Sequence, residues 1–479
     1  MNAKIFIGML LLTVSLGACK KFDYYQDNPN KPTNATPALL LTNVCNTVFN
    51  NNPESAAYAV RHLTYYERPN ESINYNWNRG SFGNYNTLRQ VQKMQELAAD
   101  NANYQGLAKF FRAVLFLQMT DTFGDIPYTE ALQAEEGLQQ PAYATQEQVY
   151  LGILQELEEA NELLSEGNGL LDGDIIYQGN VQHWKQLVNA FHLRVLIHLS
   201  KKEANSNLKI KEQFKAIVND PARYPLLQSN ADNGQLVYNS SDESNYYPTA
   251  GSLSIATLVS LEKTFVDRLK DYRDPRLFSF AEPVAGKEAG VFDNYNGVDA
   301  GLSPADQQST ASKSSLIARR YVDLKNPVNE PMIFLGYAEQ EFLIAEAITR
   351  GWLTGEAATH YANGIRASMA FYGVEEQAID AYLGQSTISL TTGDALEKIL
   401  MQKYIAFFMN SGWEPFYEQR RTGVPTFRVG PGTLNGGKVP KRWLYPLTEF
   451  QYNEAHVEEA IARQFPEGDN VNASMWLIQ

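Results

Sequence analysis

Apolar residues recur at steps of three and four positions along several long stretches of this 479-residue chain. This spacing places them on one face of an α-helix, and that face must be buried against a neighbouring element. It predicts helical pairs around residues 87–128, 145–200, 335–372 and 393–410. In three of the helices the residues that carry the pattern are Tyr104, Leu107, Ala108, Phe111, Leu115 and Met119; Val149, Ile153, Leu157, Ala160 and Leu164; and Trp184, Leu187, Val188, Phe191, Val195 and Leu199.

The predicted pair at residues 335–372 has about the length of a tetratricopeptide unit. Its two helices are joined by a turn at residues 351–355, which glycines bound at both ends. Ala345, Ala357 and Gly364 are small enough to let the two helices approach each other closely. The other pairs have similar dimensions but degenerate sequences, so the chain predicts a helical-repeat scaffold.

Three further segments, around residues 65–86, 220–331 and 410–446, lack helical periodicity. Loops of this length in a compact protein usually carry function or build a subdomain of their own. We therefore predict a mostly α fold, in which a tetratricopeptide-like helical-repeat scaffold packs against a loop-rich, irregular subdomain. We expect one body at residues 38–479, with the irregular half facing the ligand.

The N-terminus has the order of a secretory signal. Lys4 precedes an apolar run at residues 5–16, and small residues follow up to Cys19. The run is too short to span a bilayer, which needs about 20 residues. The motif Leu16-Gly17-Ala18-Cys19 resembles the bacterial lipobox, so we predict a signal peptide at residues 1–18, lipidation of Cys19 and a flexible tether at residues 19–37. The alternative is an ordinary secreted protein with a cysteine at the cleavage site.

Composition excludes one class of partner. The chain has 40 Lys and Arg against 54 Asp and Glu, a formal charge of −14. Binding to nucleic acid depends on neutralising phosphates, so we expect no nucleic-acid partner. Cys45, the only other cysteine, lies in an apolar helical stretch, and we expect it to be a core residue.

The sequence offers no catalytic or metal-ligating constellation. Its six histidines have no H-x-x-x-H spacing, and no nucleophile elbow or phosphate-binding loop occurs. Glu339, Glu341 and Glu346 could serve as paired carboxylates for glycoside cleavage, but their helical context favours structural roles. We therefore predict no catalytic residue, no metal site and no cofactor. A structural Ca²⁺ at Asp293 and Asn294 is conceivable, but the ordered ligand spacing is absent, so none is predicted.

Three loops combine aromatic and amide side chains, at residues 65–79, 238–247 and 292–296. Aromatic faces stack on sugar rings, and amide or charged groups hydrogen-bond the hydroxyls. The alternative is that these amphipathic rings fasten the loops to the helical body. The candidate ligand-binding residues are Trp77, Tyr75, Asn74, Arg79, Tyr246, Tyr247 and Tyr295.

Several motifs, in order along the chain, resemble the SusD/RagB family of outer-membrane nutrient-binding lipoproteins, in particular its SusD-like subgroup. They are the tether D-N-P-N-K-P-T at residues 27–33, the helix end F-G-D-I-P-Y at residues 123–128, the D-P-R turn at residues 274–276, an A-E-A helix at residues 345–347, the paired arginines of R-R-T-G-V-P at residues 420–425 and the closing R-W-L-Y-P at residues 442–446. We read these motifs as fold-defining, and we expect Arg420 and Arg421 to pair with buried carbonyls or acids.

The resemblance implies a surface protein that binds a nutrient, most often an oligosaccharide, and delivers it to a SusC-like TonB-dependent transporter. It implies an outer-membrane location, lipid-anchored at Cys19 and facing the cell exterior. The position of Trp77 resembles that of an aromatic ligand contact in starch-binding relatives. Two alternatives stay open: a peptide-capturing member of the same family, and an exported all-α glycoside hydrolase.

Overall fold

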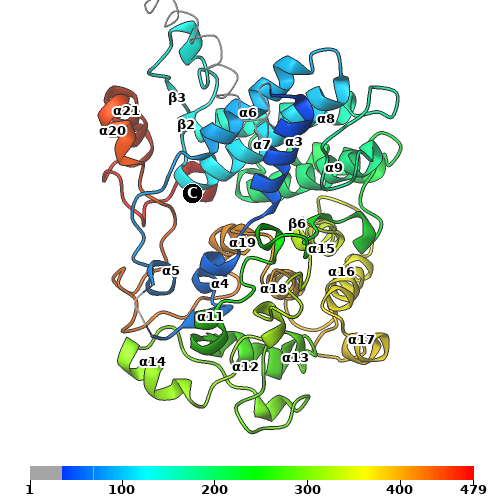
Figure 1. Cartoon of the computed structure of the whole chain (residues 1–479), viewed down its shortest axis with the longest axis vertical. Coiled ribbons are helices and arrows are strands. Elements are labelled where there is room, and N and C mark those ends of the chain that lie inside the picture. The colour runs from blue at the N-terminus through cyan, green and yellow to red at the C-terminus, as the bar shows by residue number, and fades with distance from the viewer. Residues whose placement is uncertain (1–34, 68–69) are drawn as a thin grey trace, which may run out of the picture.

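The computed structural model describes residues 35–67 and 70–479 (Figure 1). The predicted signal peptide, Cys19 and the tether as far as Asn34 lie outside the described residues. Within the described part, no helix combines the length and the apolar character that crossing a membrane requires.

Consecutive helices pack side by side to form the scaffold. α6 packs on α7, α7 on α8, α8 on α9, and α9 on both α10 and α15, while α15 also packs on α16 and α18. Figure 1 shows α6 to α9 at one end of the molecule, with α15, α18 and α19 at its centre. The bounds are α3 Pro37–Phe49, α4 Glu54–Ala59, α6 Asn84–Leu97, α7 Ala102–Phe123, α8 Gln146–Leu163, α9 Val181–His198, α10 Ile210–Asn219, α15 Tyr337–Thr349, α16 Ala357–Phe371, α17 Glu376–Leu383, α18 Ala395–Ala406 and α19 Glu414–Thr422.

Local sequence signals set the ends of these helices. The Thr145 hydroxyl accepts from the Gln148 backbone N–H, and the Gln148 side chain accepts from the Thr145 N–H, which is a complete capping box at the start of α8. Gly124 ends α7 with a φ of 94°, a value that glycine adopts without steric cost. The F-G-D-I-P-Y motif is therefore a helix end, as predicted, and it leads directly into β2.

The close approach of α15 and α16 is confirmed at Gly364. A Cβ atom placed on Gly364 would lie 2.7 Å from a ring carbon of Phe342. Any side chain larger than hydrogen at this point would force the Phe342 ring to move. The helical hairpin therefore depends on a small residue, as the sequence predicted.

The second half of the molecule is irregular, and the prediction of a mostly α fold with a loop-rich subdomain is confirmed. The strands pair antiparallel in three two-stranded sheets, β1 with β5, β4 with β6, and β2 with β3, of which the last comes from the segment between α7 and α8. The region between residues 220 and 331 also contains four short helices, α11 to α14, at the opposite end from α6 to α9 (Figure 1). The bounds are β1 Leu63–Tyr65, β2 Ile126–Pro127, β3 Tyr143–Ala144, β4 Gly234–Leu236, β5 Val259–Leu261, β6 Met332–Leu335, α5 Glu71–Asn74, α11 Leu253–Leu258, α12 Lys263–Asp271, α13 Leu277–Phe280, α14 Pro304–Ala311, α20 Leu447–Tyr452 and α21 Glu454–Gln464.

A continuous apolar cluster joins the two halves, from Leu41 near the start to Ile478 near the end. Cys45 is fully buried within it, as predicted. A smaller cluster lies among α15 to α18 and includes Phe342, Tyr361 and Ile399.

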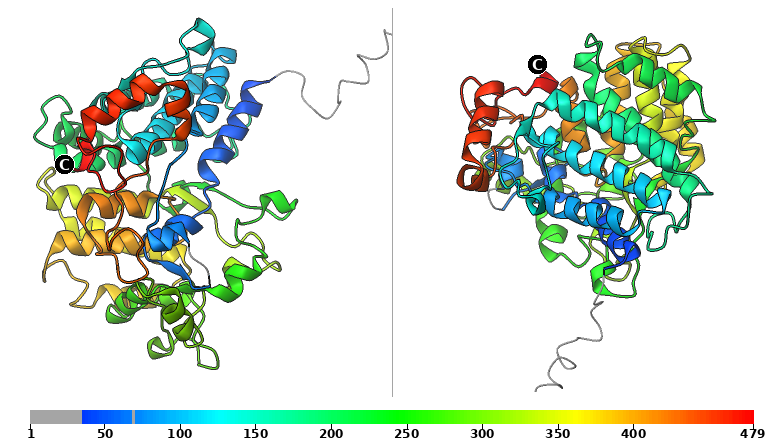
Figure 2. Two further views of the ribbon diagram at one scale, coloured as in Figure 1. Left: turned by 90° about the vertical axis from the view of Figure 1, so that its left-hand side faces the viewer. Right: turned by 90° about the horizontal axis from the view of Figure 1, so that it is seen from above.

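The C-terminal segment returns across the molecule and meets the early loop. The Leu444 N–H donates to the Asn78 carbonyl at 3.1 Å, and the Gly80 N–H donates to the Leu444 carbonyl at 2.9 Å. Figure 2 shows α20 and α21, in red, at the edge of the molecule, and α21 contacts β3. This pairing fixes the loop that carries Trp77.

Candidate functional site

Four aromatic rings meet where the early loop contacts α19 and the C-terminal segment. The Trp77 ring centroid lies 4.0 Å from that of Trp443, 4.8 Å from Phe416 and 5.5 Å from Trp413. Trp77 is only 7% exposed. Trp413 and Trp443 are half-buried, so these two rings bring the cluster to the surface.

A cavity of about 220 Å³ opens beside this cluster, on the side of Trp413. It lies where the helical scaffold meets the irregular half, since its walls come from α6, α7, α9, β6 and the segment that leads into α19. Its aromatic lining comes from Phe123, Phe191, Phe334, Trp413 and Tyr417.

The outer part of the cavity carries uncharged polar groups. Asn51, Ser81, Asn84 and Gln118 line it, and none of the four is fully buried. The Asn84 amide donates to the Gln118 side-chain oxygen at 3.0 Å, so these two side chains hold each other in place. An aromatic ring facing pre-positioned amides is suited to a ligand with apolar faces and hydroxyl edges.

Charged groups form the inner lining of the cavity, and each is paired within the protein. Arg194 donates through Nε and Nη2 to the two oxygens of Glu339, each at 2.6 Å. His198 contacts Asp121 at 3.1 Å and Glu414 at 2.8 Å. A ligand therefore meets neutralised pairs at this end of the cavity.

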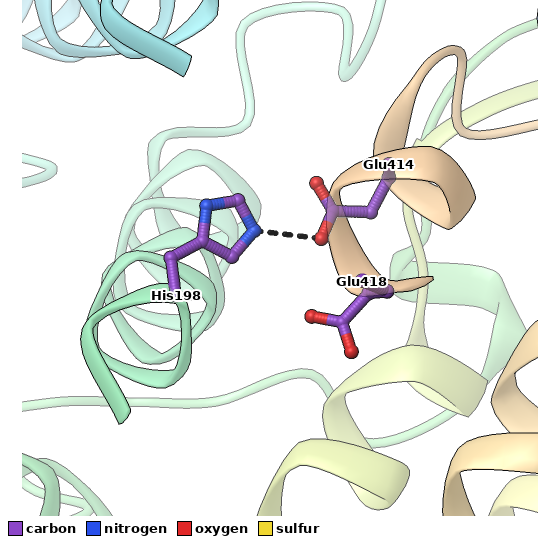
Figure 3. A group of neighbouring side chains, drawn as sticks. All are labelled: His198, Glu414 and Glu418. Atoms are coloured by element: carbon purple, nitrogen blue, oxygen red, sulfur yellow. Dashed lines mark hydrogen bonds and ion pairs between the residues drawn. The ribbon is translucent and has the colours of Figure 1, made fainter. Parts of the chain in front are cut away.

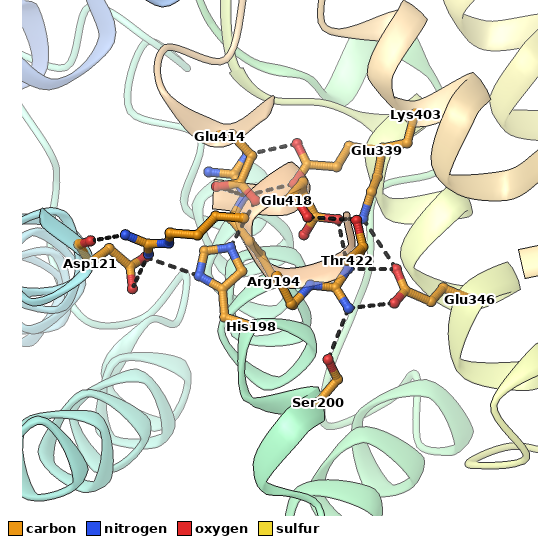
Figure 4. A network of polar contacts seen from close by, with 12 residues as sticks. Asp121, Arg194, His198, Ser200, Glu339, Glu346, Lys403, Glu414, Glu418 and Thr422 are labelled. Atoms are coloured by element: carbon orange, nitrogen blue, oxygen red, sulfur yellow. Dashed lines mark hydrogen bonds and ion pairs between the residues drawn. The ribbon is translucent and has the colours of Figure 1, made fainter. Parts of the chain in front are cut away.

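These pairs belong to a larger buried network that links α7, α9, α15, α18 and α19 (Figure 4). Arg421 contacts Glu346 at 2.6 Å and Glu418 at 2.6 Å, and Lys403 contacts the same two carboxylates. All of its side chains but one are at most 7% exposed; the exception is Arg350, 24% exposed, which pairs with Glu346 at 2.8 Å. Its five acids are Asp121, Glu339, Glu346, Glu414 and Glu418, and its six bases are Arg194, His198, Arg350, Lys403, Arg420 and Arg421.

His198 carries one of these positive charges. Burial disfavours the imidazolium form, but the carboxylates of Glu414 and Asp121 outweigh burial and raise the pKa of His198 to about 10. Burial likewise disfavours the ionised form of Glu414, yet His198 and Arg194 lower its pKa to about 2. Both groups are therefore charged near neutral pH.

His198, Glu414 and Glu418 lie close enough together to suggest a metal site (Figure 3). The donor set does not fit one. A protonated His198 uses both ring nitrogens as donors, and Lys403 and Arg421 already neutralise Glu418. A metal ion would have to displace these cations, so the cluster acts as an ion-pair network that holds the helices together.

The three glutamates considered as catalytic carboxylates have other partners. Glu339 pairs with Arg194, Glu346 with Arg421, and Glu341 accepts from His360 at 3.0 Å. Glu339 and Glu346 belong to the buried network rather than to an open cleft. The expected pairing of the two arginines is confirmed, since Arg420 donates to the backbone carbonyls of Asp121 and Lys441, and Arg421 to acids.

The predicted ligand residues of the early loop hydrogen-bond to other segments of the body. The Tyr75 hydroxyl donates to the Ala59 carbonyl at 2.8 Å, the Asn74 amide donates to the Gly432 carbonyl at 2.8 Å, and Arg79 donates to the Tyr445 carbonyl at 2.6 Å. These contacts fasten the early loop to the body.

The predicted tyrosines of the other two loops differ in exposure. Tyr247 and Tyr295 are each only 1% exposed, whereas Tyr246 is half-buried. The 238–247 loop contacts the segment that follows α3, because the Tyr238 hydroxyl donates to Asn50 at 2.9 Å. The ligand-binding role of all seven predicted residues stays a prediction.

Sequence reasoning missed the residues that line the cavity, Trp413 foremost. Asn51 follows the end of α3 and Trp413 follows a turn at Gly412, so both sit where a helix ends or begins. The one signal in the sequence that could have indicated this site is Trp413, an aromatic residue directly after a turn. The spatial meeting of Asn51, Asn84 and Trp413 has no signature in the sequence.

Comparison with known proteins gives consistent results. Residues 29–446 match the SusD-like family described as "Starch-binding associating with outer membrane". Two SusD homologues from Bacteroides fragilis NCTC 9343 are similar in structure, with TM-scores of 0.87 and 0.86 and sequence identities of 36% and 38%, over 93% of this chain and 100% of each homologue. A chitin-binding protein is similar at 25% identity and a TM-score of 0.76, over 93% of this chain and 100% of its own. Among curated proteins, none matches the sequence significantly.

Proposed function

Because this chain belongs to the SusD-like family of outer-membrane-associated binding proteins, we propose that it captures an oligosaccharide at the cell surface without chemically changing it. The family description names starch, and one relative binds chitin, so relatives of this chain take glycans of different kinds.

One observation carries the proposal: the cavity beside Trp413. The Trp413 indole and the amides of Asn51, Asn84 and Gln118 line the same cavity, while its charged side chains are paired. The site therefore presents stacking surface and hydrogen-bonding groups without a free charge. This chemistry suits a neutral sugar better than a charged peptide.

Within this proposal, Trp77 acts mainly through its neighbours. Its ring lies against Trp443, Phe416 and Trp413, so it holds the cluster from which Trp413 faces the cavity. The lipid at Cys19 tethers the body to the outer leaflet of the outer membrane, facing the cell exterior. A SusC-like TonB-dependent transporter receives the glycan. The proposed surface location, lipid anchor and transporter rest on the family resemblance and the N-terminal motif.

Binding of the purified protein to an array of neutral, amino and acidic oligosaccharides tests this function, with maltoheptaose and chitohexaose included. We expect binding to neutral glycans that Trp413→Ala weakens at least tenfold. Tyr452→Ala is the matched control, because Tyr452 is an exposed aromatic residue, 72% exposed, that lines neither this cavity nor its rim.

Three results would contradict the proposal. Binding that Trp413→Ala leaves unchanged would remove the cavity as the site. Binding to peptides but to no glycan would favour the peptide-capturing alternative. Release of shortened glycans into solution, followed by mass spectrometry, would show hydrolysis and contradict a purely binding role.

A further inference from the structure

A second concave surface lies on the irregular half, away from the cavity beside Trp413. It is an open groove of about 800 Å³ between the end of α16, α13 and the segments that lead into β4 and β6. Among the described residues, none lines both the groove and the cavity. The two come near each other at β6: Phe334 of this strand lines the cavity, and Pro331, the residue before the strand, lines the groove.

The groove combines aromatic and amide groups. Phe278 and Phe371 are half-buried and offer apolar surface, and Asn230 and Gln235 lie on the same lining. Phe278 is supported from behind by Phe292, with ring centroids 4.6 Å apart, so it cannot easily turn away. The groove thus has the two kinds of group that a sugar ring requires.

Two polar atoms of the groove are buried without a partner. Asn329 Nδ2 and Glu330 Oε1 make no hydrogen bond within the described part of the chain. Glu330 is 7% exposed. A buried polar atom without a partner costs free energy, about 1–3 kcal/mol, so such atoms call for a ligand or water to satisfy them. A donor and an acceptor on adjacent residues match a hydroxyl group, which can accept from one and donate to the other.

The charges of the groove favour an uncharged ligand. Arg320 contacts Glu330 Oε2 at 2.6 Å, and its other groups donate to the Ser279 carbonyl, Asn329 and the Tyr321 hydroxyl. All three nitrogens of the Arg320 guanidinium therefore already donate within the protein, which disfavours binding of an anion. Glu282, at the exposed edge, would repel an acidic sugar.

We propose that this groove is a second carbohydrate-binding site, which takes a neutral sugar unit between Phe278 and Phe371 and hydrogen-bonds it through Asn329 and Glu330. Two separate sites on one body would let the protein hold two chains, or two parts of one branched glycan. The second site does not depend on the first, because different residues build each.

Calorimetry with the neutral glycan that binds most tightly on the array tests the second site. Wild type should bind with a stoichiometry of two, and Phe371→Ala should reduce it to one or weaken the second event roughly tenfold. Asn329→Gly is the second variant, because Asn329 has a φ of 43°, which glycine adopts freely, so the backbone keeps its shape while the amide is lost. It should weaken the same event by about two- to tenfold, the worth of one hydrogen bond. Tyr452→Ala again serves as the control.

The outcomes separate this proposal from the proposed function. If Phe371→Ala and Asn329→Gly both fold and bind as wild type does, the groove is not a carbohydrate site, whatever happens at Trp413. A stoichiometry of one that Trp413→Ala abolishes also overturns the groove and leaves the cavity. Binding that survives Trp413→Ala but fails in Phe371→Ala supports the groove and removes the cavity. If wild type binds no neutral glycan on the array, both proposals fall.

Discussion

The indole of Trp77 stacks on that of Trp443, with ring centroids 4.0 Å apart and planes 16° from parallel. The two residues are far apart in the sequence. Their backbones are joined beside the stack, where residues 78 and 80 hydrogen-bond to Leu444. The C-terminal segment therefore holds the early aromatic loop against α19, and this contact determines where Trp413 faces.

Replacing Trp77 by alanine should lower the stability of the protein by about 3–5 kcal/mol, because it removes a buried indole from a packed cluster. Chemical denaturation followed by far-ultraviolet circular dichroism, which reports on the helices and not on tryptophan fluorescence, measures this loss. Trp413→Ala should cost less, because Trp413 is half-buried. A Trp77→Ala protein of unchanged stability that no longer binds glycan would show instead that Trp77 contacts the ligand directly.

Breaking the Arg421–Glu346 pair should also be costly. Arg421→Met leaves the fully buried Glu346 without its bidentate partner, and such a loss costs about 3–5 kcal/mol. Arg223→Met is the matched control, because Arg223 pairs with Glu158 at the surface and its side chain is 53% exposed. Exposed pairs contribute about 0–1 kcal/mol. Equal losses in the two variants would contradict a stabilising role for the buried network.

The charge of His198 predicts a pH dependence. Its pKa is raised from 6.5 to about 10 in the folded state, so the folded protein holds this proton more tightly than the unfolded chain does. The stabilisation is present in full below about pH 6.5, the ordinary pKa of histidine, and is lost as the pH rises towards 10. Free energies of unfolding measured from pH 6 to pH 10 should therefore fall more steeply in wild type than in His198→Gln. Parallel curves would show that His198 does not carry the charge assigned to it.

Gly364→Ala should separate α15 from α16. The added methyl group would lie 2.7 Å from the Phe342 ring, and overpacking of this kind costs about 1–3 kcal/mol. Gly167→Ala is the control, since a Cβ there would meet nothing within 4 Å. Thermal unfolding should show a lower midpoint for Gly364→Ala alone. A Gly364→Ala protein as stable as wild type would mean that the helices can move apart at no cost.

Much of the fold could be predicted from local patterns. The apolar spacing from Tyr104 to Met119 lies within α7, and the turn glycine Gly124 ends that helix. The small residue Gly364 marked the close helix pair before any contact was known. These signals are readable because helical periodicity, capping and steric size act between residues close together in the chain.

The candidate site was harder to predict, because its parts come from distant segments. The aromatic loop around Trp77 was recognised, but not that its ring is covered by Trp443, or that Trp413 faces the cavity. Glu339 and Glu346 were recognised as structural, but their partners, Arg194 and Arg421, lie far from them in the sequence. The local sequence around an acidic residue in a helix does not show whether its side chain is solvated or pairs with a buried arginine.

The sequence by itself determined the helical scaffold, the family and the kinds of side chain available for binding, because each of these depends on local order and composition. Only the tertiary structure decided which aromatic rings are buried in the core and which line a cavity. It also decided which buried acids and bases pair with one another. The physical reason is that burial and charge pairing depend on which segments meet in space, and loops with no periodicity of their own carry no local record of their partners.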